Sequence, residues 1–191
     1  MDGSGEQFSG QVRVQHPRRP PLIPALSRSD IDRDYLSRAL GIPSLLEDPR
    51  TRVVVLHEGQ ALGTGGGGLA LVEPSAVGRL HHETAVFLGR ISTPVADLEA
   101  GAAVIAVHVD AEDAEALGEI WLDLRQVGSL LGPRDAGLFA QAVAIANWHR
   151  GYGFSPATGR ATTVTQSGWV RIDPETSREH FPRVEPAGIV A

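Results

Sequence analysis

The sequence predicts an α+β fold, in which a mixed or antiparallel β domain with helices precedes a small β-hairpin module. Short β-branched and apolar runs separated by turn residues follow residue 50 at regular intervals, and helical patterns stand before and after them. Strands and helices do not alternate as a doubly wound sheet would require. We therefore place the α+β domain at residues 29–150 and the hairpin module at residues 151–183.

In the first part of the chain, the sequence predicts a leader with little regular structure, followed by a helix. Residues 1–28 are polar and rich in proline, which indicates a leader with little regular structure. Ser29 and Asp32 resemble an N-cap, and Gly41 resembles a helix end. The apolar face of this helix would consist of Ile31, Tyr35, Leu36, Ala39 and Leu40.

The strands are expected in the middle of the chain. The stretch RVVVLHEGQALG from Arg52 has a β-branched run, a Glu-Gly turn and a second short run, which is typical of a hairpin. Further strands are expected at residues 69–72, 85–88 and 103–109. The acidic stretch Asp110–Glu119 after them is interpreted as a solvated face or a connector, because Gly118 interrupts any helix there.

One long helix is expected next. Pro133 stands near its start, Leu138, Ala142 and Ile145 recur at helical spacing, and Gly151 marks its end. The composition then shifts to Thr, Ser, Gly and Pro, which marks the beginning of the hairpin module.

Composition excludes several classes of protein. The net charge of −6 over 191 residues disfavours DNA binding, which needs clustered positive charge. The absence of cysteine excludes disulfides, thiolate nucleophiles and cysteine-ligated zinc. The sequence has neither a signal-peptide pattern nor a long apolar run, so we expect no membrane contact and a cytoplasmic location.

Local motifs give no catalytic site. Residues 63–68 match G-x-G-x-x-G, but Pro74 follows closely and no helix start faces the loop, so a surface loop is the better interpretation. The neighbours His81 and His82 cannot readily chelate one ion, and the acidic stretch lacks the further groups of a hydrolytic Mg²⁺ site. We interpret three other histidines, which stand in apolar runs, as core or boundary residues: His57, His108 and His149.

The hairpin module has the spacing of a zinc ribbon without its ligands. The turns S-P-A-T and D-P-E-T place four slots in a C-x2-C-x14-C-x2-C pattern, occupied by Ser155, Thr158, Asp173 and Thr176. Hydroxyls and one carboxylate are poor zinc ligands, so zinc is expected to be absent. Such side chains favour tight turns, and packing would replace part of the stabilisation that a metal gives. The aromatic and aliphatic residues expected to pack are Phe154, Trp169, Ile172 and Phe181.

Around these turns the chain carries N-W-H-R at residues 147–150, G-W at residues 168–169 and F-P-R at residues 181–183. With AVFLGR and DLRQVGSLL further upstream, these motifs resemble the N-terminal portion of the NADH pyrophosphatases, which are NAD⁺ diphosphatases of the Nudix superfamily. The lack of cysteine matches the branch of that family whose zinc ribbon has lost its ligands.

The resemblance implies a homodimeric enzyme whose full-length form uses Mg²⁺ or Mn²⁺ to hydrolyse NADH, NAD⁺ or NAD-capped RNA, releasing NMNH or NMN and AMP. Phe181 resembles the aromatic residue that stacks on a base of the dinucleotide; its alternative role is in the hairpin core. The sequence contains no R-E-x-x-E-E Nudix box, and residues 184–191 resemble the start of the Nudix domain. We therefore expect a truncated, non-catalytic segment with no cofactor of its own, which meets NAD(H) only beside a Nudix domain.

Two other functions stay open. A stand-alone module could bind nucleotides or RNA ends through arginines of the hairpin region, although nearby carboxylates nearly cancel their charge. These arginines are Arg150, Arg160, Arg171, Arg178 and Arg183. A complete hydrolase would need a catalytic constellation, which the sequence does not contain.

Overall fold

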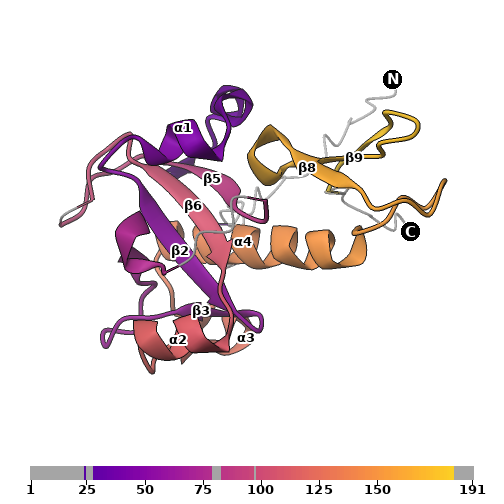
Figure 1. The fold of residues 1–191 in the computed structure, drawn as a ribbon. Helices are drawn as coiled ribbons and strands as arrows, with labels where there is room; N and C mark the ends of the chain where they lie inside the picture. The colour runs from indigo at the N-terminus through magenta and orange to yellow at the C-terminus, as the bar shows by residue number, and fades with distance from the viewer. Residues whose placement is uncertain (1–23, 25–27, 79–82, 97, 183–191) are drawn as a thin grey trace, which may run out of the picture.

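The computed structural model describes residues 24, 28–78, 83–96 and 98–182 (Figure 1). The architecture is α+β, as predicted, with a seven-stranded mixed sheet and a separate three-stranded antiparallel sheet. Most of the expected leader, the pair His81-His82 and residues 183–191 lie outside the described residues.

The large sheet has the strand order β1-β5-β6-β2-β3-β7, and β4 also pairs with β2. Strands β2 and β6 are parallel, whereas the other strand pairs among the described residues of this sheet are antiparallel. The strands are β1 (Ile31–Asp32), β2 (Arg52–His57), β3 (Gln60–Leu62), β4 (Leu71–Val72), β5 (Val86–Ile91), β6 (Ala103–His108) and β7 (Trp121–Leu122). The predicted hairpin after residue 52 and the three further strands are thus confirmed.

The hairpin turn shows why its two residues are needed. Glu58 and Gly59 both have positive φ, 48° and 86°. Two such residues form the tight turn whose twist matches a hairpin, and glycine adopts the second conformation without strain.

The predicted helix from Ser29 is wrong in its start and in its burial. Ile31 pairs with Ile91 at the edge of the sheet, so the chain is extended there. Asp34 has φ 34°, and its N–H binds the Asp32 carboxylate, which keeps a helix from starting earlier. The next elements are a 3-10 helix, η2 (Tyr35–Leu40), and a short α-helix, α1 (Ile42–Leu46). The expected apolar face is largely exposed on η2.

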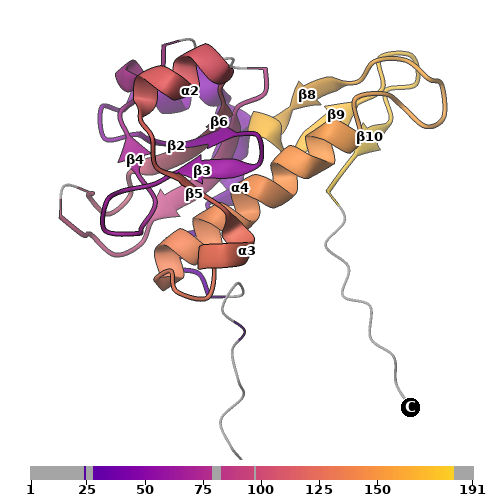
Figure 2. The same ribbon diagram turned by 90° about the horizontal axis from the view of Figure 1, so that it is seen from below.

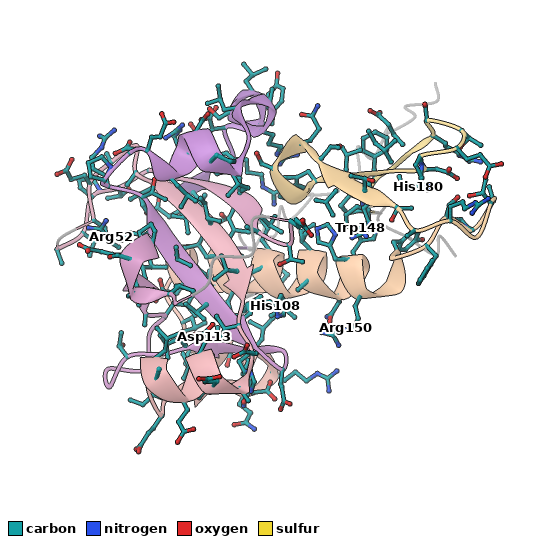
Figure 3. The ribbon with its side chains drawn as sticks, viewed as in Figure 1. Arg52, His108, Asp113, Trp148, Arg150 and His180 are labelled. Atoms are coloured by element: carbon teal, nitrogen blue, oxygen red, sulfur yellow. The ribbon has the colours of Figure 1, made fainter. Side chains whose placement is uncertain are left out.

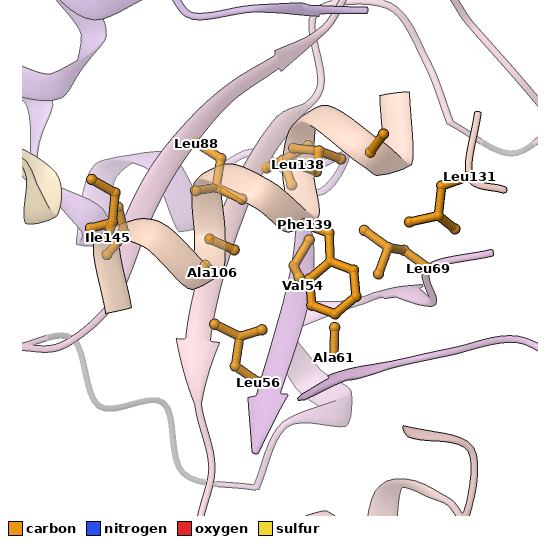
Figure 4. Close-up of a cluster of buried hydrophobic side chains, with 14 of the residues drawn as sticks. Val54, Leu56, Ala61, Leu69, Leu88, Ala106, Leu131, Leu138, Phe139 and Ile145 are labelled. Carbon is orange, nitrogen blue, oxygen red and sulfur yellow. The ribbon is translucent and has the colours of Figure 1, made fainter. Parts of the chain in front are cut away.

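Helices cover both faces of the large sheet (Figures 1 and 2). The long helix α4 (Pro133–Gly151) lies where predicted and packs on one face (Figure 4). Helices α1 and α2 (Ala111–Leu117) pack on the other face. Strand residues alternate between the two cores, as in β2, where Val54 and Leu56 face α4 and Val53 and Val55 face α1 and α2.

The acidic stretch is a helix rather than the expected connector. The Asp110 side chain accepts a hydrogen bond from the Asp113 N–H at 3.0 Å and caps α2. Gly118, with φ 144°, ends the helix at the position where the sequence shows an interruption. Ala114 is buried and its carboxylate neighbours face solvent, so the solvated face was predicted correctly.

The remaining short elements connect these layers. They are the 3-10 helix η3 (Pro74–Ala76) and the helix α3 (Leu124–Val127). The glycine-rich loop at residues 63–68 is a largely exposed turn between β3 and β4, and the element that directly follows it is a strand rather than a helix, which confirms the interpretation as a surface loop. Among the described helices, none is both long and apolar enough to cross a membrane.

The hairpin module forms the second sheet, with strand order β10-β9-β8. Its elements are β8 (Thr163–Thr165), the 3-10 helix η4 (Gln166–Gly168), β9 (Val170–Ile172) and β10 (Glu179–His180). It lies beside the C-terminal half of α4, beyond the edge of the large sheet (Figure 1).

The G-W pair fixes the module to the large sheet. The Trp169 Nε1–H donates to the Phe87 carbonyl of β5 at 2.7 Å. Gly168 has φ 93°, and a Cβ there would lie 2.8 to 2.9 Å from atoms of Ala85 and Val86. The Gly168 carbonyl accepts from His149 Nε2 of α4 at 2.8 Å. Only glycine allows this close approach of the backbone to β5.

Candidate functional site

The two predicted turns of the hairpin module share one backbone pattern. The N–H of the first residue, Ser155 or Asp173, donates to the carbonyl five residues later, at 2.8 and 3.0 Å. The carbonyl of the same residue accepts from the N–H four residues later, at 2.8 Å in both turns. The turns are therefore equivalent in backbone geometry.

Their side chains repeat the pattern. Ser155 Oγ accepts from the N–H two residues later at 3.3 Å, and Asp173 Oδ1 does the same at 2.9 Å. Thr158 Oγ1 and Thr176 Oγ1 accept from the N–H two residues beyond them, at 3.3 and 3.4 Å. Side-chain oxygens in these slots stabilise the turns from within.

The Asp173 carboxylate joins the two turns. Thr158 Oγ1 donates to Asp173 Oδ2 at 2.7 Å, and the Ser155 hydroxyl is bonded to the same carboxylate. The Asp173 side chain is buried. The hydroxyls of Ser155 and Thr158, with the N–H groups of Glu175 and Thr176, hold the pKa of this carboxyl far below its usual range. We call Ser155, Thr158, Asp173 and Thr176 the turn pair.

The turn pair does not fit a zinc ion. Zinc in structural sites takes thiolate or imidazole ligands in a tetrahedron, and the turn pair offers three hydroxyls and one carboxylate. Two of those hydroxyls are bonded to the carboxylate rather than available to a metal. In the part of the chain that the structure describes, no three His, Cys, Asp or Glu side chains gather as a metal site would require.

A cleft of about 430 Å³ lies between η2 and the hairpin module. Phe181 stands at its wall directly after β10, and its side chain is 56% exposed. We call this the Phe181 cleft. The aromatic and charged residues that line it are Arg33, Tyr35, Arg38, Trp169, Glu179 and Phe181.

Aromatic and cationic groups meet in the Phe181 cleft. Tyr35 is 68% exposed and Trp169 is buried, so the cleft has one buried ring and two accessible ones. The Arg38 guanidinium lies 3.7 Å from the centre of the Trp169 ring. Burial, and then the neighbouring Arg33, lower the pKa of Arg38. The cleft therefore suits a flat aromatic group with negative charge attached to it.

Backbone strain shapes the floor of the Phe181 cleft. Gln166 lines the cleft with φ 51°, and Ser167 follows with φ 48°. Such values are rare for residues with a side chain and persist where surrounding contacts fix them. Here the Ser167 hydroxyl donates to the Arg38 carbonyl at 2.8 Å, which ties the strained turn to η2.

The expected packing of the module is only partly correct. Trp169 is buried in the core beneath the large sheet. Phe154 is 68% exposed and Phe181 is 56% exposed, so neither packs against the first domain as expected, and Ile172 is half-buried. The three-stranded sheet is too narrow to enclose them. Phe181 is therefore not a core residue of the hairpin.

The wall of the Phe181 cleft that comes from η2 and the residues before it was not predicted from the sequence. Tyr35 was expected on the apolar face of a helix, and no role was predicted for Arg33 or Arg38. Contact between η2 and η4 brings all three to the module. The exposure of the Tyr35 ring could not be predicted from the local sequence, because the helical periodicity of its neighbours indicated a buried face.

The other sequence candidates are dispersed. His57 lies at the end of β2, with Nδ1 3.2 Å from the Val109 carbonyl, as a boundary histidine should. Arg160 is paired with Glu175 at 3.3 Å, and Arg178 lies in an exposed turn. Arg150 and Arg171 instead border another cavity, beside α4. The structure thus does not gather the four described arginines into one basic surface, and Arg183 lies outside the described residues.

Comparison with known proteins gives a family match. The family model described as "NADH pyrophosphatase-like rudimentary NUDIX domain" matches residues 50–148, about half of the chain. Those residues comprise most of the large sheet and nearly all of α4.

Curated relatives match over a longer stretch. Proteins named NAD-capped RNA hydrolase NudC from Mycobacterium tuberculosis (strain H37Rv) and Mycobacterium bovis (strain AF2122/97) are each 34% identical to this chain over 179 residues. The match covers 87% of this chain and 52% of each relative. The chain thus spans about half the length of the curated relatives it matches.

Proposed function

The chain belongs to the family with the NADH pyrophosphatase-like rudimentary NUDIX domain, and on that premise we propose that it is the non-catalytic N-terminal segment of an NAD(H) diphosphatase. In this proposal the whole enzyme hydrolyses NADH, NAD⁺ or NAD-capped RNA to NMNH or NMN and AMP. The segment shapes the substrate cleft and supports a homodimer.

The Phe181 cleft is the observation that carries the proposal. It combines two exposed rings, Tyr35 and Phe181, with the guanidinium groups of Arg33 and Arg38. Among the described residues Arg33 has no ion-pair partner, so its charge is available to a ligand. A dinucleotide offers flat bases to the rings and a pyrophosphate to the arginines.

Each group has a role in the proposal. Phe181 stacks on one base of the dinucleotide, because its exposed face is free of the hairpin core. Arg33 attracts the pyrophosphate. Arg38 holds the Trp169 ring and η2 together and so positions the wall that carries Tyr35.

Catalysis is assigned to a Nudix domain beside this segment. The 191 residues include no R-E-x-x-E-E box, and the described residues gather no carboxylate cluster for Mg²⁺ or Mn²⁺. We therefore propose that the segment alone does not hydrolyse NADH.

We further propose that the turn pair descends from a zinc ribbon. Its two equivalent turns and its four-slot spacing support this origin. In the proposal the buried Asp173 carboxylate replaces the ion, because one anion joins both turns through hydrogen bonds. The turn pair then sets the course of β10 and places Phe181 at the cleft.

Replacement of the whole turn pair by cysteine tests this origin. The fourfold variant should bind one zinc ion, with Zn–S distances near 2.3 Å by X-ray absorption. Failure to bind zinc would count against descent from a zinc ribbon.

A chimera tests the proposed function. Residues 1–182 would be fused to the second half of the Mycobacterium tuberculosis NudC, and NADH hydrolysis would be followed by chromatography of AMP and NMNH. We expect turnover by the chimera and none by the 191-residue chain.

The substitution Phe181→Ala tests the cleft within the chimera. We expect KM for NADH to rise about tenfold, because a stacked base contributes about 1–3 kcal/mol. Phe154→Ala is the matched control, since Phe154 is also an exposed ring of the hairpin module but does not line the cleft. Equal KM values for the two variants would contradict the role of Phe181.

The homodimer is tested separately by analytical ultracentrifugation of the chain and the chimera. A chimera that sediments as a monomer while it turns over NADH would overturn the dimer proposal and leave the cleft assignment in place.

A further inference from the structure

A second cavity, of about 380 Å³, lies beside the C-terminal half of α4. We call it the helix cavity. It shares no lining residue with the Phe181 cleft. Its walls come from the large sheet, from α4 and from β9, so three parts of the chain that are distant in sequence build it.

Small residues on α4 create the helix cavity. Towards the N-terminal half of α4 the space above the sheet is filled by Leu138 and Phe139 (Figure 4). One and two turns further on, Ala142 and Ala146 face the sheet instead, and short side chains leave the space empty. Leu56 and further apolar side chains of the sheet form the floor.

Basic side chains surround this apolar floor. His108 follows Val104 and Ala106 on the face of β6 that looks to α4, because strand residues alternate. His149 and Arg150 come from the last turns of α4, and Arg171 comes from β9. In Figure 3, His108 and Arg150 lie on the same side of α4. None of the described residues that line the helix cavity is an aspartate or glutamate.

Hydrogen bonds fix two of these groups. His149 Nε2 donates to the Gly168 carbonyl at 2.8 Å, so its Nδ1 accepts from Arg171 Nη1 at 2.9 Å. Arg171 also donates to the Thr162 hydroxyl at 2.6 Å and to the Thr162 carbonyl at 3.2 Å. All of these acceptors are neutral, so the charge of Arg171 is held in place without being neutralised.

The other two groups are available. In the described part of the chain, the side chain of Arg150 makes no ion pair, and the side chains of Arg150 and His108 make no hydrogen bond. Arg150 is exposed at the rim and His108 is half-buried. A ligand can therefore reach one unpaired guanidinium and one imidazole while it contacts the held guanidinium of Arg171.

We propose that the helix cavity binds a nucleoside 5′-monophosphate. The phosphate would bind Arg150, Arg171 and His108, and the nucleoside would lie on the apolar floor next to Ala142 and Ala146. Guanidinium groups match phosphate oxygens in charge and geometry. The cavity volume falls within the range of about 300–1,000 Å³ typical of small-ligand sites, which likewise combine apolar walls with a few polar groups. This inference does not depend on the proposed function.

Calorimetry with the 191-residue chain tests the helix cavity. AMP, GMP, CMP and UMP would each be titrated, with adenosine and inorganic phosphate as the two fragments. We expect saturable binding of at least one monophosphate, and binding at least about tenfold weaker for each fragment, because the cavity uses both parts of the ligand. If no monophosphate binds, or if inorganic phosphate binds equally well, the proposal is wrong.

Single substitutions test whether the monophosphate binds in the helix cavity. Arg150→Ala removes a phosphate contact and Ala146→Leu fills the cavity, and each should weaken binding at least about tenfold. Arg125→Ala is the matched control, since Arg125 is exposed and lies outside the cavity. If Phe181→Ala abolished the binding instead, the monophosphate would lie in the Phe181 cleft and the assignment to the helix cavity would be wrong. Binding that survives both Arg150→Ala and Ala146→Leu would overturn the assignment; circular dichroism checks that both variants fold.

Discussion

The substitution Trp169→Phe would test how the hairpin module is held to the large sheet. Trp169 is the buried ring of the module, and its Nε1–H donates to the Phe87 carbonyl at 2.7 Å. Its face contacts the Arg38 guanidinium, 3.7 Å away. Phenylalanine keeps an aromatic ring but loses the donor and part of the volume.

The expected loss of stability follows from these contacts. An unpaired buried carbonyl and a lost hydrogen bond cost about 1–3 kcal/mol. The smaller ring loses packing and weakens the contact with Arg38, which adds about 1–2 kcal/mol. Trp169→Phe should therefore reduce the free energy of unfolding by about 2–5 kcal/mol, and lower Tm by roughly 4–20 °C in a chain of this size.

Trp148→Phe is the matched control. Trp148 is partly buried in the same core, but its Nε1 is buried without a hydrogen-bond partner among the described residues. Removal of an unpaired N–H offsets the lost packing, so the change should stay within about 1 kcal/mol. Urea unfolding followed by far-UV circular dichroism measures both variants. If Trp148→Phe cost as much as Trp169→Phe, the hydrogen bond to β5 would not be what holds the module.

Three other predictions concern the same region. Gly168→Ala should cost about 2–4 kcal/mol in urea unfolding, because φ is 93° and the added Cβ crowds β5, and a cost below about 1 kcal/mol would contradict this. Burial, and then the nearby Arg171, lower the pKa of His149 from 6.5 to about 4. As the pH falls from 6.5 to 4, the unfolded chain therefore binds a proton that the folded chain does not, and the free energy of unfolding should decrease. This decrease should be smaller in His149→Gln. The pKa of Asp173 is lowered from its ordinary value of 3.8, so its ionised carboxylate stabilises the fold above pH 3.8 and this stabilisation is lost as the pH falls further. In Asp173→Asn, the free energy of unfolding from urea titrations should therefore depend less on pH below 3.8.

The strands and the long helix were predictable because local pattern and tertiary burial agree there. In β2 the β-branched run is buried on both faces, and in α4 the apolar residues recur at helical spacing towards the sheet. The two turns of the turn pair were also predictable, because Ser, Thr and Asp side chains stabilise turns by hydrogen bonds to the nearby backbone.

Two errors show where local pattern fails. The apolar residues of η2 fit a helical face, yet Asp34 breaks the helix and β1 pairs with the sheet instead. The acidic stretch lacks an apolar stripe, yet one buried alanine and the Asp110 cap are enough for a two-turn helix on a sheet. In both cases a tertiary contact or a cap decided the structure, and neither can be deduced from composition.

The position of Phe181 illustrates the same limit for the candidate site. Its role could be suggested from motifs, but its partners Tyr35 and Arg38 lie near the other end of the chain and reach it through the strained turn at Ser167. No periodicity links residues at such a separation. The contact depends on Gly168, which lets η4 approach β5 closely enough for the module to face η2.

The attachment of the module also explains how such a small sheet can fold when the turn pair alone stabilises its two turns. A stand-alone ribbon depends on its ion, because three short strands bury too little apolar surface. Here Trp169 lies in the core of the first domain, and Gly168 and Arg171 are bonded to His149 of α4. The stability of the module is therefore coupled to that of the α+β domain, and the turn pair has only to keep its own two turns in register. A fragment covering only the module should accordingly be unfolded in solution by NMR, whereas the same residues in the whole chain should be ordered; a folded fragment would show that the turn pair alone is sufficient.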